Sequence, residues 1–145
     1  MLCPSGVRQA LAHERTPVGT YLLAQDDGHL VLLTIAPGGN AFSQQTGQFE
    51  PPAVFGDQQG GWTMPRAGKI LIRTIDFTRD TATGSFTGFG RCLYTASLNP
   101  DGTLTGKFLV EIFPPDADPL DLSPSNIPTE TFGPVNFTGR RLKVR

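Results

Sequence analysis

The same four-residue pattern, a polar residue followed by an apolar residue, threonine and glycine, occurs three times in the second half of this chain. The copies are Ser85-Phe86-Thr87-Gly88, Thr103-Leu104-Thr105-Gly106 and Asn136-Phe137-Thr138-Gly139. Each copy follows a segment of turn residues and opens a strand-like run. Strands joined in this way form a β-meander, and a meander with glycines on its strands can curl until it closes. The repeat therefore predicts an all-β fold, a single antiparallel up-and-down β-barrel.

Length and composition narrow the class of protein. A chain of 145 residues fits one domain. With 17% charged residues and a net charge of −1, we expect neither a nucleic acid nor a membrane as partner. No cysteines or histidines stand at metal-ligand spacing, and no phosphate-binding loop or nucleophile elbow occurs, so we expect no metal and no cofactor. The first residues lack the apolar core of a signal peptide, which predicts a cytoplasmic protein.

Alternating runs and turn residues predict about eight strands in a barrel domain of residues 19–145. The expected strands are 19–24, 29–35, 40–44, 62–64, 69–78, 85–98, 103–113 and 136–145. Residues 1–18 are expected to form an N-terminal segment with a short helix over 10–14. A polar stretch over 45–61 is expected to be a long loop. The Pro-rich segment 114–134 is expected to be a loop that crosses the outside or caps one end of the barrel.

The second copy of the repeat indicates which face of the sheet is inside. Its alternation is clean, and the apolar set is Leu104, Gly106, Phe108, Val110 and Ile112. The same phase in the first copy places inward Phe86, Gly88, Gly90, Cys92, Tyr94, Ala96 and Leu98, and leaves Thr87, Phe89 and Arg91 outside. Inward glycines both bend a strand and leave space, so they predict an apolar cavity. The alternative is that the glycines only turn corners and large neighbours fill the lumen.

Three short segments carry a resemblance to a known family. Gly19-Thr20-Tyr21, Gly61-Trp62 and Gly139-Arg140-Arg141-Leu142 resemble the motifs of small bacterial lipocalin-like barrels of the calycin type. A typical member has Gly-x-Trp in its first strand and a late arginine across that tryptophan. The resemblance implies that Tyr21 takes the place of the tryptophan, with Arg140 or Arg141 as its partner. The pattern is also similar to allene oxide cyclase-type barrels, which implies an apolar fatty-acid- or polyketide-derived substrate.

Two residues are candidates for catalysis. Tyr94, inward beside Cys92, is a candidate general acid for a bound carbonyl. The strand 70–78 alternates ambiguously, so either Arg73 or Asp76 points inward, and an inward Arg73 would bind a carboxylate or an oxyanion. The structural alternatives are a core tyrosine with a small buried cysteine, and an arginine on the outer face.

The expected function is binding of a small hydrophobic molecule in the lumen, polyketide-, terpenoid- or fatty-acid-like. The expected ligand-binding residues are Tyr21, Phe42, Trp62, Cys92 and Phe108. A cofactor-free cyclase or isomerase would use the lumen to fold its substrate. The alternatives are a carrier without catalysis and a filled barrel that acts as an interaction domain, and the sequence leaves a homodimer open. The basic closing strand, 140–145, is either an anion site or a solubilising edge.

Overall fold

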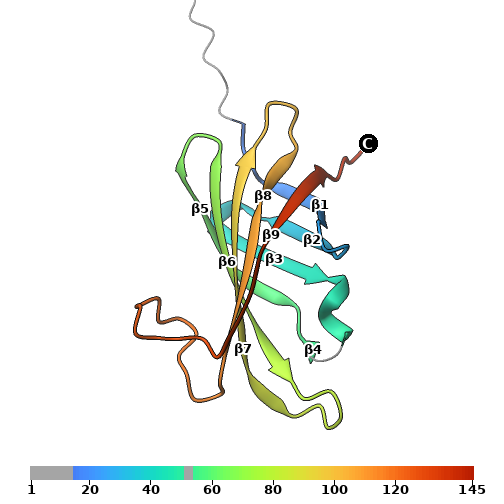
Figure 1. Ribbon diagram of the computed structural model, residues 1–145. Helices are drawn as coiled ribbons and strands as arrows, with labels where there is room; N and C mark the ends of the chain where they lie inside the picture. Colours follow the sequence, from blue (N-terminus) through green and yellow to red (C-terminus); the bar gives the residue numbers. More distant parts are fainter. Residues whose placement is uncertain (1–14, 51–53) are drawn as a thin grey trace, which may run out of the picture.

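The computed structural model describes residues 15–50 and 54–145, which form a closed antiparallel β-barrel (Figure 1). Its strands are β1 (Gly19–Gln25), β2 (Leu30–Ile35), β3 (Asn40–Gln45), β4 (Val54–Phe55), β5 (Gln58–Arg66), β6 (Lys69–Arg79), β7 (Phe86–Leu98), β8 (Leu104–Phe113) and β9 (Glu130–Arg141). Two 3-10 turns, η1 (Pro37–Gly39) and η2 (Thr46–Phe49), flank β3. In this described part of the chain, no helix has the length and apolarity needed to cross a bilayer.

Eight of the strands make the ring, in the order β6-β5-β3-β2-β1-β9-β8-β7, and β6 pairs with β7 to close it. β1 pairs with β9 from Tyr21 opposite Arg141 to Gln25 opposite Phe137. The short β4 pairs with the end of β6 beyond the last partner of β5. The predicted all-β barrel of about eight antiparallel strands is therefore confirmed.

Several element bounds differ from the prediction. The segment 45–61, predicted as a loop, contains η2, β4 and the start of β5. The closing strand begins at Glu130, inside the segment predicted as a Pro-rich loop, and it ends at Arg141. It accommodates Gly133 and Pro134 where its register with β8 shifts, as is typical of a β-bulge. The helix predicted over 10–14 lies outside the described residues.

The inward faces of β7 and β8 follow the predicted phase except at Phe86. Gly88, Gly90, Cys92, Tyr94 and Ala96 are buried on β7, and Leu104 and Phe108 on β8. Phe86 is 45% exposed, because the register between β6 and β7 shifts next to it and Thr87 is the extra residue. Its ring packs outside the barrel against Phe77 and Phe89, with centroids 5.9 Å and 5.2 Å away.

The sequence predicted that the inward glycines leave empty space, and this prediction is wrong. A Cβ atom at Gly88 would collide with the backbone oxygen of Phe113, and one at Gly106 with the backbone oxygen of Thr95. These two glycines let neighbouring strands approach closely. A Cβ atom at Gly90 would lie 2.5 Å from the carboxylate oxygen Oδ1 of Asp76. The space beside Gly90 is therefore taken by a side chain of the protein itself.

The interior of the barrel is filled at one end and hollow at the other. The filled end holds a buried apolar cluster that includes Tyr21, Leu23, Leu33, Ile35, Ile70, Ile72, Leu104 and Phe137. Toward the other end the inward residues become polar: β1 ends in Gln25, β3 in Gln45, and β6 in Thr74, Asp76 and Thr78. The predicted cavity and the predicted filled barrel thus each describe one half of the molecule.

The Pro-rich segment crosses the outer surface of β7 and β8, where it covers Arg91. Arg91 points outward, as predicted, but only 7% of it is exposed. Its Nε donates to Glu111 at 2.8 Å, and its Nη1 donates to the backbone oxygens of Pro119 and Asp121 at 3.1 Å and 2.8 Å. The guanidinium also lies 4.6 Å from the centre of the Phe113 ring. Arg91 therefore fastens this segment to the barrel wall.

Candidate functional site

A pocket of about 270 Å³ opens at the hollow end of the barrel. Its lining comes from strands on both sides of the ring and from the β1–β2 turn and η2, which rim it. Three further depressions, of about 340, 290 and 430 Å³, are lined mainly by turns and by outward residues of the strands. The pocket at the hollow end is therefore the candidate site.

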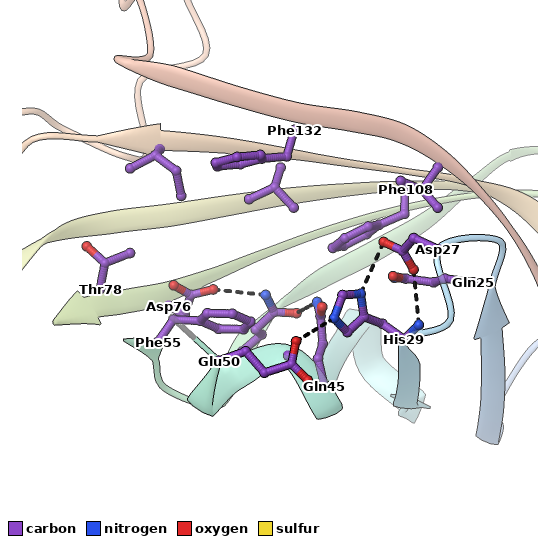
Figure 2. A pocket seen from close by; sticks show the side chains of 15 residues that line it. Gln25, Asp27, His29, Gln45, Glu50, Phe55, Asp76, Thr78, Phe108 and Phe132 are labelled. Atoms are coloured by element: carbon purple, nitrogen blue, oxygen red, sulfur yellow. Dashed lines mark hydrogen bonds and ion pairs between the residues drawn. The ribbon is translucent and has the colours of Figure 1, made fainter. Parts of the chain in front are cut away.

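The pocket has one apolar wall and one polar wall (Figure 2). The apolar wall comes from β8 and β9 and consists of Phe108, Val110, Ile112, Phe132 and Val135. Phe55, on β4, lies on the opposite side, next to Asp76. The polar wall comes from β1, β3, β5 and β6 and consists of Gln25, Gln45, Gln58, Asp76 and Thr78. The walls differ because the inward face of β8 stays apolar to its end, whereas that of β6 turns polar at Thr74. A molecule in the pocket would meet hydrocarbon on one side and hydrogen-bonding groups on the other.

Gln58 is the centre of the polar wall. Its side chain is 1% exposed. Its Oε1 accepts from Ser43 Oγ at 2.5 Å and from Gln45 Nε2 at 3.0 Å. The Tyr94 hydroxyl lies 3.2 Å from the same oxygen. On the other side, Gln58 Nε2 donates to Asp76 Oδ2 at 2.9 Å and lies 2.8 Å from Cys92 Sγ. This network fixes the side chains that face the pocket, because both ends of the amide are held.

Asp76 presents an unpaired carboxylate oxygen at the pocket. Only 5% of the residue is exposed, and among the described residues Oδ1 accepts no hydrogen bond of ordinary geometry. Asp76 also forms no ion pair with any residue of 15–50 and 54–145. Burial raises the pKa of Asp76 to about 6, against the opposing effects of the Gln58 side chain and the Gly90 backbone N–H. The Nε2 of Gln25 is likewise buried without a partner, so the wall offers one free acceptor and one free donor.

The rim of the pocket is formed by an ion-pair cluster around His29. Its Nε2 lies 2.9 Å from Glu50 Oε2, and its Nδ1 lies 3.2 Å from Asp27 Oδ2. These hydrogen bonds, first that of Glu50 and then that of Asp27, raise the pKa of His29. In residues 15–50 and 54–145, no three His, Cys, Asp or Glu side chains are placed to hold a metal ion. This cluster could not be predicted from the sequence, because it is η2 that brings Glu50 to the β1–β2 turn.

Of the five residues predicted to bind the ligand, Phe108 lines the pocket. Phe42 is 45% exposed on the outer face of β3, because Ala41 and Ser43 take the inward positions. Trp62 and Tyr21 lie in the filled half. The Trp62 indole donates to the backbone oxygen of Ala36 at 2.7 Å.

Tyr21 makes the contact that the resemblance implied. Its hydroxyl donates to the backbone oxygen of Pro17 at 2.8 Å, and the Arg141 guanidinium lies 5.7 Å from the centre of its ring. Arg141 also donates to the backbone oxygen of Val18. Because Gln25, at the far end of β1, lines the pocket, this contact lies toward the opposite end of the barrel. The basic closing strand is therefore not at the mouth of this pocket.

The two predicted catalytic residues do not face the pocket. Of the two alternatives for β6, Asp76 is the inward residue, and Arg73 is exposed on the outer face with Phe77, so it does not point into the lumen. Tyr94 and its neighbour Cys92 are fully buried behind Gln58, and burial raises the pKa of both groups. Both act as partners of the polar wall.

The closed ring of eight antiparallel strands is compatible with a lipocalin-like architecture. Its geometry shows the fold and the pocket without assigning a family. No protein-family model matches this chain, and neither a curated protein nor a solved structure matches it at a significant level.

Proposed function

We propose that this protein binds a small, largely apolar molecule in the pocket at the hollow end of its barrel. The observation that carries the proposal is the pairing of an apolar wall with a buried polar wall around about 270 Å³ of space. Binding pockets for small molecules start at roughly this size and combine apolar surface with a few converging polar groups. A carrier or binding protein needs no more than this.

The charges at the pocket distinguish among the expected ligand types. Asp27, Glu50 and Asp76 line it, and His29 is the one basic side chain among them. A fatty acid would bring its carboxylate among these three acidic groups, and like charges in a poorly solvated site repel strongly. Neutral terpenoid- or polyketide-like molecules therefore fit this pocket better than fatty acids do.

The neutral dye N-phenyl-1-naphthylamine tests this proposal, because its fluorescence rises in apolar surroundings. We expect saturable binding to the protein. Ile112 lies in the apolar wall, so Ile112→Trp fills the pocket and is expected to raise the dissociation constant at least about tenfold. Ile127→Trp is the matched control, because Ile127 is 76% exposed in the Pro-rich segment. The measurement is a fluorescence titration of all three proteins.

Circular dichroism of each variant shows whether the barrel is intact. If the folded Ile112→Trp variant binds the dye as tightly as the Ile127→Trp control, the dye does not occupy this pocket. That outcome contradicts the proposed function, as does the absence of any saturable binding to the unaltered protein.

A cofactor-free isomerase or cyclase is the second candidate function, and Asp76 is the residue that favours it. Its free oxygen Oδ1 is buried at the pocket, and its pKa of about 6 suits proton transfer near neutral pH. As a base, the carboxylate would take a proton from a carbon next to a carbonyl group. The resulting enolate would then take the same proton back from the carboxyl group at a different carbon of its conjugated system.

Hydrogen exchange in a model ketone tests this candidate. With 1-tetralone in D2O, proton NMR follows replacement of the hydrogens next to the carbonyl. We expect the protein to accelerate this exchange about tenfold, a modest effect for a single general base. Asp76→Asn should return the rate to that of buffer, whereas Asp116→Asn, in the exposed Pro-rich segment, should not. Equal rates with Asp76→Asn and Asp116→Asn would contradict a catalytic role for Asp76.

A further inference from the structure

We infer that the molecule bound in this pocket is a hydrophobic amine, whose protonated nitrogen pairs with the carboxylate of Asp76. The inference rests on the proposed binding function and names the chemical class of its ligand. Three features of the pocket support it, and each concerns a different group of residues.

The first feature is the isolation of Asp76. The residue is 5% exposed, Gln58 is the one side chain that donates to its carboxylate, the backbone N–H of Gly90 also lies beside it, and in the described residues no lysine, arginine or histidine forms an ion pair with it. A buried charge without a partner is strongly unfavourable, and a donor that also carries the opposite charge gives the largest compensation. An ammonium group placed at Oδ1 supplies both.

The second feature is the charge of the surrounding residues. The titratable side chains that line the pocket are Asp27, His29, Glu50 and Asp76. Even with His29 protonated, the acidic groups outnumber the basic one. From β7, the Cys92 thiol and the Tyr94 phenol face the same network, and burial, which raises the pKa of each, keeps both neutral. The field at the mouth therefore attracts cations and repels anions.

The third feature is the wall opposite Asp76. Figure 2 shows Phe108 and Phe132 across the pocket from Asp76, and Val110, Ile112 and Val135 complete this apolar side. A hydrocarbon body packs against these side chains while its nitrogen reaches the carboxylate. Gln25 Nε2, which has no hydrogen-bond partner among the described residues, offers a separate donor to an oxygen atom on the same ligand. The combination selects an amphiphilic amine over an unsubstituted hydrocarbon.

A series of three ligands with one chain and different head groups tests the inference. n-Octylamine, n-octanol and n-octanoate are titrated into the protein by calorimetry at about pH 8, where the amine is protonated and Asp76 is ionised. We expect the amine to bind at least about tenfold more tightly than the alcohol, and the carboxylate to bind most weakly. Asp76→Asn should bring the amine and alcohol constants together, whereas Asp116→Asn, which changes the net charge equally, should keep them apart.

The outcomes separate the two proposals. If the dye and the alcohol bind but the amine binds no better than the alcohol, the inference about the ligand class is wrong and the proposed binding function stands. If the Asp76→Asn variant keeps the full preference for the amine, the carboxylate is not its partner, and the inference is again wrong. If neither the dye nor any octyl compound binds, the proposed function itself fails.

Discussion

Replacement of Asp76 by asparagine is expected to raise the free energy of unfolding by about 3 kcal/mol at about pH 8. Burial raises the pKa of Asp76 from its ordinary value of 3.8 to about 6, and each pKa unit corresponds to about 1.4 kcal/mol. The ionised carboxylate therefore destabilises the folded protein. Asparagine keeps the shape and can accept the hydrogen bond from Gln58 Nε2, but it carries no charge. Chemical denaturation without ligand measures the difference.

The raised pKa of Asp76 also determines how the free energy of unfolding depends on pH. Below about pH 4 the carboxyl group is protonated in the folded and the unfolded protein, and it contributes nothing. Between about pH 4 and pH 6 the folded protein holds a proton that the unfolded chain has lost, so stability falls as the pH rises. Above about pH 6 the carboxyl group is ionised in both the folded and the unfolded protein, and the full destabilisation by the buried charge is present. The gap between Asp76→Asn and the unaltered protein should therefore open over this window.

Comparison of the two proteins isolates Asp76 from the other titrating groups. The raised pKa of His29 and the lowered pKa values of Asp80, Asp101 and Asp121 are common to both and cancel. Around the carboxyl group, Cys92, Tyr94, Asp27 and Glu50 are also unchanged. Asp116→Asn serves as the exposed control. If Asp76→Asn and Asp116→Asn have the same stability at every pH, the Asp76 carboxylate is not buried in the folded protein.

Replacement of Gly106 by alanine is expected to lower the free energy of unfolding by about 3 kcal/mol, the upper part of the range for overpacked sites. The new Cβ atom would collide with the backbone oxygen of Thr95 and lie 2.9 Å from both Ala96 Cα and Phe137 Cζ. The backbone on β7 cannot move without disturbing its hydrogen bonds. A larger side chain at Gly106 therefore tests the approach of β7 and β8, and not the volume of the pocket.

Gly56→Ala is the matched control. Nothing lies within 4 Å of the Cβ position at Gly56, and its backbone lies outside the left-handed region. The control should be neutral or slightly more stable, because alanine restricts the unfolded chain. Thermal or urea denaturation compares the variants. Equal stabilities for Gly106→Ala and Gly56→Ala would show that β7 and β8 do not approach as closely as the structure indicates.

The sequence was sufficient for the fold because local signals agree along most of it. The repeated turn and strand-entry pattern marks β7, β8 and β9, and the alternation of β8 gives the inward face directly. Phe86 was placed on the wrong face because a bulge changes the phase of a strand without a mark in its own alternation. The interior glycines were misread because their role depends on the backbone of the neighbouring strand.

The candidate site could not be predicted from local patterns. Gln25, Gln45, Gln58 and Asp76 come from four strands, and only the register of the whole barrel brings them to one wall. Gln45 and Gln58 stand in a polar stretch with the composition of a loop. On β6 both faces carry apolar residues, so alternation did not distinguish Asp76 from Arg73. Phe42 was misplaced because a large aromatic residue was expected to face inward.

The division of the barrel into a filled half and a hollow half separates two kinds of adaptation. Most of the side chains in the buried apolar cluster, such as Leu23, Ile72 and Leu104, do not line the cavity, and Phe108 is the member of the cluster that does. Mutations around the mouth of the pocket can then change which ligand binds, with little effect on the stability of the fold. Such an arrangement lends itself to diversification of specificity, in descendants of this chain or in a randomised library, on a scaffold that stays constant.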